Sequence, residues 1–369
     1  MSSSATEPSD TLRIVGQVYP WDLAGDPGRA ARWRELGVDA VSIATLYHEV
    51  RSMRWQPDGS PQVVVQPAST YVPSDDPMLP GPPSGLADDL ALAAYDAARA
   101  GGLEPVAWLS LTHRDGMTDF QQRFATRDPW GNRSTYALCP SHAQVRAASV
   151  ALIRTVHERG GVTAFQVETL GALGFEHGVA HDKADFAWLG RGSRRALSTC
   201  CCDGCTALAG EHGIELEAAA AALRDAVGSR PDDADGEIFE ALDEVRRLAT
   251  ARHVREIADL ADSIGADITV AVSSDRSTSG PFAAIPELDD RLHPYALLDD
   301  PAAWNTPGRS GAVLEMRPPA SFADALGDLP LESLDDLYLY HLGTRRPDTL
   351  DPRAIHDIRR EHRRRREAA

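Results

Sequence analysis

The feature that most constrains the fold is the alternation of apolar, β-branched runs with segments of helical pattern. The runs are continuously apolar, which is typical of parallel strands covered on both faces. The helical segments carry start and stop signals, such as Asp26 and Pro27 before one segment and Gly37 after it. Strand-like runs and helical segments alternate through the first half of the chain, at residues 11–21, 26–37, 38–48, 85–102, 103–113, 142–161 and 162–170.

The second half is less regular, but it completes a set of eight strands. Further strand-like runs lie at 266–274, 291–298, 311–318 and 334–343, and the run at 291–298 has the weakest signal. Eight strands joined by helices favour an α/β fold of the (β/α)8 TIM-barrel type. A doubly wound sheet is the competing architecture, but no glycine-rich phosphate loop follows the first strand.

Two excursions interrupt the strand and helix rhythm. The first follows the second strand as a proline-rich stretch at 51–83, in which "PQVVVQP" at 61–67 indicates part of a small hairpin. The second follows the fourth strand, where residues 171–215 contain a cysteine triplet and no clear strand, and an alanine-rich helical stretch follows. We therefore predict a disordered tail at 1–10 and one barrel domain at 11–369, with a cysteine-rich helical segment inserted at about 171–264.

Charge and composition exclude some classes of binding partner and indicate the cellular compartment of the protein. The net charge of -18 argues against a nucleic acid or an anionic membrane as partner, because phosphates would be repelled. No window approaches the ~20 apolar residues of a membrane span, and "MSSSATEPSD" has no apolar signal-peptide core. We expect a cytoplasmic protein with reduced thiols, and the sequence leaves its oligomeric state open. The arginine-rich end at 359–369 is typical of a solvated final helix.

The carboxyl ends of barrel strands carry the chemistry of this fold. Glu168 and Glu315 each end an otherwise apolar strand, the fourth and the seventh. One such glutamate alone is more often a capping or ion-paired residue. Two of them beside strand-end aromatics can protonate a glycosidic oxygen and attack the anomeric carbon of a sugar. The predicted substrate-binding residues at the strand ends are Tyr19, Trp21, His48, His113, Asp275 and Tyr340.

Other interpretations of these strand-end residues stay open. His48 and His113 can instead be core histidines with satisfied hydrogen bonds, and Asp275 can cap the following helix. Along the last strand, Tyr340 and His341 fall on opposite faces, so we expect only one of the two faces to look into the barrel mouth.

All five cysteines lie in "LCPSHAQVR" at 138–146 and "TCCCDGC" at 199–205. Clustered cysteines in a reducing compartment more often bind metal than form disulfides. These two stretches flank "AFQVE", and the set resembles the glycoside hydrolase family 42 β-galactosidases. Those enzymes have a cysteine before the fourth barrel strand, a glutamate at its end and further cysteines after it.

The resemblance implies a retaining glycoside hydrolase that acts on a carbohydrate. It makes Glu168 the acid/base and Glu315, in "VLEMRPP", the nucleophile. It also implies a structural zinc ion held by Cys139, Cys200, Cys202 and Cys205, with Cys201 as a bystander. Four thiolates close a tetrahedral zinc shell and leave no open position, which agrees with a structural role.

The chain departs from the family pattern directly before the acid/base. Val167 stands where the family has an asparagine that contacts the 2-hydroxyl of the sugar, so β-galactosidase specificity does not follow. The segment before the cysteine triplet is also longer than in the family and carries His177 and His181 at helical spacing. Two alternatives therefore stand beside the hydrolase: a carbohydrate-binding barrel without catalysis, and a metal-dependent hydrolase that uses histidines.

Overall fold

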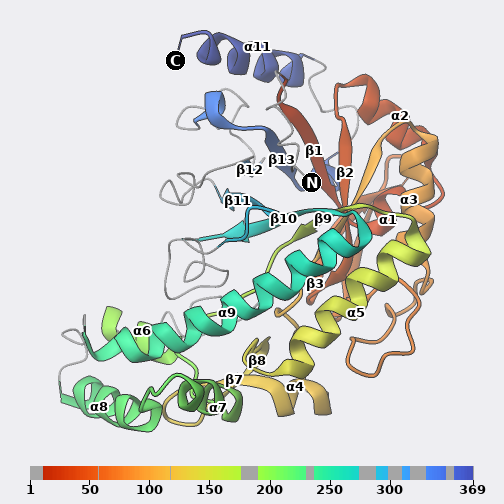
Figure 1. Ribbon diagram of the computed structural model, residues 1–369. Helices are drawn as coiled ribbons and strands as arrows, with labels where there is room; N and C mark the ends of the chain where they lie inside the picture. The colour runs from red at the N-terminus through yellow and green to blue at the C-terminus, as the bar shows by residue number, and fades with distance from the viewer. Residues whose placement is uncertain are drawn as a thin grey trace.

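The computed structural model describes residues 11–56, 58–116, 118–175, 190–229, 237–273, 288–297, 310–315, 330–345 and 353–368. Its centre is a closed barrel of eight parallel strands, in which β1 pairs with both β2 and β13, so the sheet has no free edge within the ring. The predicted TIM barrel is confirmed, including its weakly signalled sixth strand (Figure 1). The strands are β1 (Arg13–Val18), β2 (Ala40–Tyr47), β6 (Glu104–Leu109), β9 (Ala164–Val167), β10 (Asp267–Val272), β11 (His293–Leu297), β12 (Gly311–Glu315) and β13 (Asp336–Tyr340).

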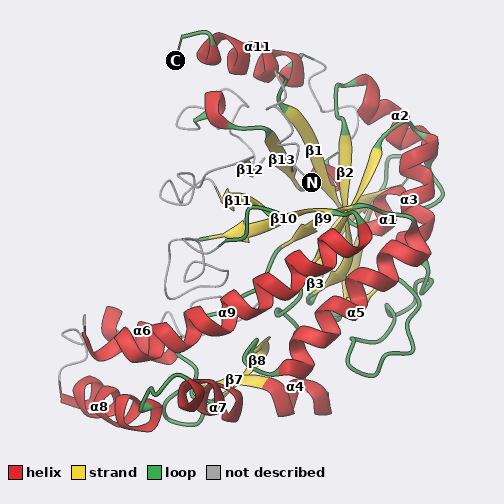
Figure 2. Cartoon of the chain, in the orientation of Figure 1, coloured by secondary structure: helices red, strands yellow, loops and turns green. Residues whose placement is uncertain are grey.

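Helices cover the outside of the barrel, as Figure 2 shows. Their local sequence explains their bounds: Asp26 accepts the Arg29 N–H at 2.8 Å at the start of one, and Gly161 adopts the left-handed conformation that ends another. None of the described helices has the length and apolar character needed to span a membrane. The covering helices are α2 (Pro27–Glu35), α3 (Leu90–Ala100), α5 (Ala143–Gly160), the second half of α9 (Glu237–Ile264) and α11 (Ala354–Arg366).

The excursion after β2 contains the predicted hairpin. Strands β3 (Val50–Trp55) and β4 (Pro61–Gln66) pair in antiparallel fashion, and the short β5 (Ser69–Thr70) returns to pair with β2. The first strand ends earlier than predicted. It stops at Val18, because Pro20 starts the short helix α1 (Pro20–Leu23).

A second hairpin, which the sequence analysis did not predict, lies between β6 and α5. Helix α4 (Asp119–Phe124) leads into β7 (Ala125–Arg127), which pairs with β8 (Arg133–Leu138). The segment was missed because its polar residues read as a loop. Its turn is held by Asp128, which accepts the N–H groups of Trp130 and Asn132, both at 2.9 Å.

The longest described helix joins two separate apolar clusters. The first half of α9, with Phe239 and Leu242, packs with the cysteines and with helices α6 (Arg191–Leu197), α7 (Asp203–Glu211) and α8 (Leu216–Ser229). Its second half, with Val254 and Ile257, belongs to the core between the barrel and its helices. Figure 1 shows α9 running from the α6–α8 group to the barrel.

Side-chain alternation divides each barrel strand between an outer and an inner face. Outward residues such as Ile14 and Phe165 pack under the helices, whereas inward residues such as Val15, Ala164 and Tyr338 form their own cluster inside the ring. The interior leaves room only for small residues at some positions. A Cβ on Gly311 would lie 3.0 Å from the ring of Tyr338.

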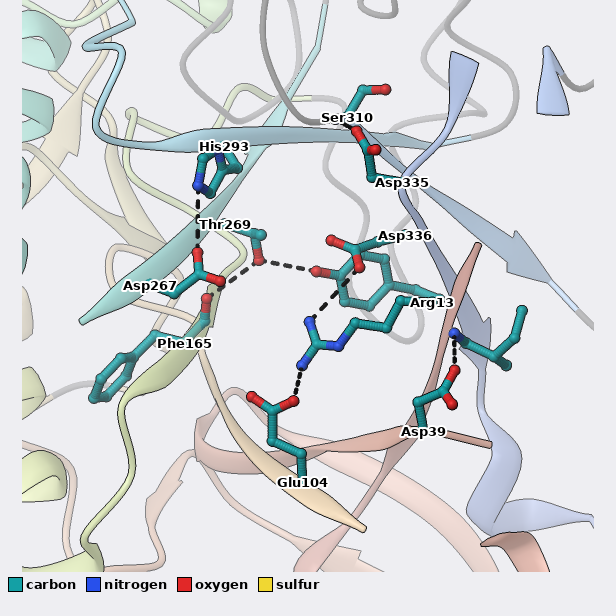
Figure 3. A network of polar contacts seen from close by, with 12 residues as sticks. Arg13, Asp39, Glu104, Phe165, Asp267, Thr269, His293, Ser310, Asp335 and Asp336 are labelled. Carbon is teal, nitrogen blue, oxygen red and sulfur yellow. Dashed lines mark hydrogen bonds and ion pairs between the residues drawn. The ribbon is translucent and has the colours of Figure 1, made fainter. Parts of the chain in front are cut away.

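The amino ends of the strands form a polar rim at the barrel bottom (Figure 3). Arg13 Nη2 lies 2.7 Å from Glu104 Oε2, and its Nη1 lies 3.6 Å from Asp336 Oδ1. On the opposite arc of the ring, His293 Nε2 lies 3.5 Å from Asp267 Oδ1. The Arg13–Asp336 and His293–Asp267 pairs join neighbouring strands, and the Arg13–Glu104 pair spans β2. All three lie at the amino ends of the strands, where polar residues serve stability in this fold.

Replacing Arg13 by Met should lower the free energy of unfolding by about 2 kcal/mol, because it removes a cation beside the buried Asp336, which is 1% exposed. The matched change Glu104→Gln should cost less than about 1 kcal/mol, because that carboxylate is 52% exposed. Urea unfolding at neutral pH measures both. Equal losses in the two variants would show that burial of Asp336 does not set the effect.

Candidate functional site

Glu168 lies on the inner face of the barrel at its carboxyl end. Alternation along β9 places Ala164, Gln166 and Glu168 on that face, and the Glu168 N–H donates to the Leu109 carbonyl at 2.9 Å. Two donors from the next strand orient its carboxylate. Trp108 Nε1 donates to Oε2 at 2.8 Å and Ser110 Oγ donates to the same oxygen at 3.1 Å. Both bonds use the same oxygen of the carboxylate.

A bulge in β2 brings a second aromatic ring to this face. The register with β6 shifts between Ala44 and Leu46, so Thr45 is an extra residue. Without this shift, the side chain of Leu46 would point into the barrel. With the shift, the side chain of Tyr47 points inward instead. Its ring packs edge-on against Trp108, with 4.7 Å between the ring centroids. The Thr45 hydroxyl meanwhile points outward and hydrogen-bonds Tyr95 of α3.

The predicted strand-end aromatics Tyr19 and Trp21 lie at the same end of the barrel, but their ring faces are covered. Tyr19 stacks on Trp21 at 4.5 Å and on His341 at 4.6 Å, one ring on each side. The two residues are 5% and 4% exposed, so neither offers an open ring to a sugar in this structure. Tyr340, which is partly exposed and packs against His341 at 3.8 Å, is better placed to do so.

The expectation that only one of Tyr340 and His341 faces the mouth was wrong. Both rings pack against Trp108, at 6.2 and 5.3 Å. Strand β13 ends at Tyr340, and a short 3-10 turn (Leu342–Thr344) follows, so His341 no longer obeys strand alternation. Its Nε2 lies 3.2 Å from Tyr19 Oη, and burial lowers the pKa of His341 to about 3, so the ring is neutral at physiological pH.

His48 and His113 lie beside Glu168 at the ends of the neighbouring strands. Their rings stack at 4.1 Å with an interplanar angle of 18°. His113 is 3% exposed and lies behind the more open His48. The Asp115 carboxylate lies 4.0 Å from His48 Nδ1 and 3.7 Å from His113 Nε2. Side-chain donor atoms of His48, His113 and Glu168 all lie within 4.8 Å of one another.

The loop after Glu168 is held by buried hydrogen bonds. The Thr169 hydroxyl accepts the N–H groups of Thr112 and His113, at 3.2 and 3.1 Å, which fixes His113 beside the end of the strand that carries Glu168. From α9, Arg246 donates to the Ala172 carbonyl at 2.7 Å, and His253 Nδ1 lies 2.9 Å from the Leu170 carbonyl.

Several predicted site residues are only partly described or lie outside the description. Glu315 is the last residue of β12 and lies opposite Tyr340 in the sheet register, which places its backbone at the carboxyl end of the seventh strand. The structure describes nothing of its side chain. Asp275, His177 and His181 lie outside the described residues, and their assignments stay predictions.

The four predicted metal ligands meet in one cluster. The sulfurs of Cys139, Cys200, Cys202 and Cys205 all lie within 4.8 Å of one another, and no disulfide joins them. Four sulfurs around one zinc ion would be about 3.8 Å apart, so the set can hold a metal ion with little movement. Cys201 is not part of the cluster, in agreement with its predicted role as a bystander.

Neighbouring groups hydrogen-bond the sulfurs and shift the pKa values of the thiols. The Arg127 N–H donates to Cys200 Sγ at 3.3 Å, and the Ser141 hydroxyl lies 3.1 Å from Cys205 Sγ. Hydrogen bonds from the other three thiols hold the pKa of Cys202 below its usual value, whereas the same contacts raise the pKa of Cys200. One thiolate therefore forms readily, and a bound cation would favour ionisation of the others.

Sequence reasoning placed Tyr47 at the end of the second strand, but it missed Trp108 and Ser110 and did not predict that Tyr47 and His341 point inward. Val106, Trp108 and Ser110 are alternate residues of one strand. Because alternate side chains of a strand lie on the same face, the sequence predicts that all three share the inner face. That signal was present in "VAWLS". No such signal exists for Tyr47, because its direction depends on the bulge at Thr45.

Comparison with known proteins supports the fold. No protein-family model matches the chain, and no curated protein matches it in sequence. The glycoside hydrolase domain of PgaB (BpsB) from Bordetella bronchiseptica is similar in structure, with a TM-score of 0.56 and 14% identity over 94% of this chain and 99% of that one. The catalytic domain of β-amylase from Paenibacillus polymyxa has a TM-score of 0.53 and 12% identity, covering 92% of this chain and 94% of that one.

A third similar structure is a β-galactosidase from the psychrophilic Marinomonas ef1, with a TM-score of 0.53 and 12% identity over 95% of this chain. This chain spans 59% of that enzyme. At these identities the likeness establishes the barrel fold, and the activity has to be argued from the site.

Replacing Cys202 by Ser should abolish metal binding at the cluster and lower the free energy of unfolding by more than about 3 kcal/mol, because the ion would link α7 to the start of α5. The neighbouring change Cys201→Ser is the matched control and should stay within about 1 kcal/mol of the native protein. Elemental analysis and urea unfolding check the pair. A cluster that carries no metal in the native protein would contradict the assignment.

The buried His253 should make stability depend on pH. Burial lowers its folded-state pKa from 6.5 to about 4, so the unfolded chain binds more protons in this window. Stability should therefore fall by on the order of 2 kcal/mol from pH 7 to pH 5, and this dependence should disappear above pH 7. Urea unfolding of His253→Leu should show a flatter slope, whereas the exposed His356→Leu should keep the native slope. Identical slopes in all three proteins would refute the effect.

Proposed function

We propose that the protein is a retaining glycoside hydrolase, with Glu168 as acid/base and Glu315 as nucleophile. The observation that carries the proposal is the held carboxylate of Glu168, which two donors fix through one oxygen at the carboxyl end of the fourth barrel strand. A carboxyl group that is held in one orientation at this end of the barrel suits proton transfer to a leaving oxygen.

The placement of the second glutamate supports a two-carboxylate reaction. Glu315 ends the seventh strand at the same end of the barrel as Glu168. A retaining mechanism requires the two carboxyl groups ~5–5.5 Å apart on opposite sides of the anomeric carbon. In the first step the Glu315 carboxylate bonds to the anomeric carbon while Glu168 gives its proton to the leaving oxygen. In the second step Glu168 takes a proton from water, and that water displaces Glu315.

The rings around the mouth fit a sugar-like substrate. Tyr340 and the neutral His341 contact Trp108, which donates to Glu168, and the partly exposed His48 has a ring nitrogen within 4.8 Å of the Glu168 carboxylate. Among the described residues, the buried Nδ1 of His341 has no hydrogen-bond partner. The similar structures include a β-amylase and a β-galactosidase, and the proposal extends a carbohydrate substrate to this chain.

We further propose that the ion in the four-cysteine cluster is zinc with a structural role. Four sulfur ligands favour zinc among the common cellular divalent ions and leave no position for water or substrate. The cluster lies in the apolar group of α7 and α9 and not with the strand-end residues, so it would stabilise this region without entering the reaction.

Glu315→Gln should remove nearly all turnover, because no covalent glycosyl intermediate can form. Glu168→Gln should slow substrates with poor leaving groups by about 10²–10⁴-fold and spare the first step for activated aryl glycosides, which need little protonation. The measurement is a screen of nitrophenyl glycosides, followed by intact-mass detection of the adduct that a fluorosugar traps.

The exposed Glu35→Gln on α2 is the matched control and should keep native rates. Native turnover in Glu315→Gln would exclude it as the nucleophile. If no glycoside is cleaved and no adduct forms across the panel, the barrel is better described as a binding protein.

A further inference from the structure

We propose that the barrel mouth binds a divalent transition-metal ion through His48, His113 and Glu168, at a site separate from the cysteine cluster. These three residues follow three neighbouring strands, β2, β6 and β9, in the order in which those strands pair. Each offers one donor atom, and the three atoms lie within 4.8 Å of one another.

The donor set is one that binds borderline metals. Two imidazoles and one carboxylate are the ligands of catalytic zinc sites and of the facial triad that holds iron(II). Three protein ligands leave coordination positions open, in contrast to the four sulfurs of the cysteine cluster. A metal ion here would therefore keep water or accept an oxygen ligand from the mouth.

Hydrogen bonds orient two of the three donors, whereas the stacked rings of His48 and His113, 4.1 Å apart with 18° between their planes, would have to turn apart to reach one ion. His48 Nδ1 lies 2.8 Å from the Glu49 carbonyl, so this nitrogen carries the proton and Nε2 presents its lone pair. Trp108 and Ser110 hold the Glu168 carboxylate by Oε2. Groups that fix the tautomer of a histidine and the direction of a carboxylate commonly support bound metals.

Charge around the rings also favours a cation. The Asp115 carboxylate lies within 4.0 Å of a nitrogen on each of the two imidazoles. It is anchored by the Glu49 N–H at 2.8 Å, so it cannot move away freely. A second negative charge close to the ligands would raise the affinity for a divalent ion.

This site goes beyond the proposed hydrolysis and conflicts with it at one residue. A metal ion on Glu168 occupies the carboxyl group that would protonate the leaving oxygen. Glu168 then cannot bind the metal ion and protonate the leaving oxygen at the same time. If the proposed hydrolysis holds, the metal inhibits it at the concentration at which it binds.

The test uses the full chain with its cysteines loaded with one equivalent of zinc, so that added Co²⁺ reports only on the mouth. Calorimetry should find one further Co²⁺ ion per chain. The complex should show the visible bands of nitrogen and oxygen ligation without thiolate charge-transfer absorption. His48→Ala and Glu168→Gln should each weaken binding by at least about 100-fold, because loss of a direct ligand costs more than loss of a group that orients one.

His341→Asn is the matched control, since it changes a mouth histidine outside the triad and should retain Co²⁺ affinity within a few-fold. Absence of a second ion in the native protein, or equal binding in His48→Ala and Glu168→Gln, would overturn the proposal. Binding is read without any substrate, so its failure is separate from failure of the hydrolase assignment. A protein that cleaves glycosides yet binds no Co²⁺ would lose only the metal site.

Discussion

The closed ring of parallel hydrogen bonds is the constraint on which the rest of the structure depends. Because β1 pairs with both β2 and β13, each barrel strand has a neighbour on either side and its two faces are separated into interior and exterior. All strands run in one direction, so their amino ends collect in the polar rim around Arg13 and their carboxyl ends collect in the mouth. The strand-end residues of the site lie close together because the barrel is closed and its strands are parallel.

The single long helix α9 connects the cysteine cluster to that mouth. Its first half packs with the cysteines, and its second half packs on the barrel. Between them, Arg246 and His253 bond the carbonyls of the loop that begins after Glu168. The same helix therefore contacts both the cysteine cluster and the loop that follows Glu168.

The mouth itself combines two kinds of chemistry around one carboxylate. Glu168 has a glutamate on the seventh strand of the same barrel end, and it also has two histidines at its side. The first arrangement suits cleavage of a glycosidic bond, and the second suits a metal ion. The two proposals compete for one residue, because proton transfer and metal ligation would both use the Glu168 carboxyl group.

The sequence by itself determined the barrel, the hairpin at 61–67, the grouping of four cysteines without Cys201, and the strand-end position of Glu168. The cysteine set follows from the family resemblance, and the others follow from patterns along the chain, namely apolar runs and turn residues, which act over a few residues. Only the tertiary structure decided which rings face the mouth. The bulge at Thr45 turns the side chain of Tyr47 into the barrel. Strand β13 ends at Tyr340, so the side chain of His341 does not follow the in-and-out alternation of the strand. The pairing of His48 and His113 with Glu168 likewise requires three strands to meet at one barrel end. Such contacts join residues far apart in the chain, and no local pattern encodes them.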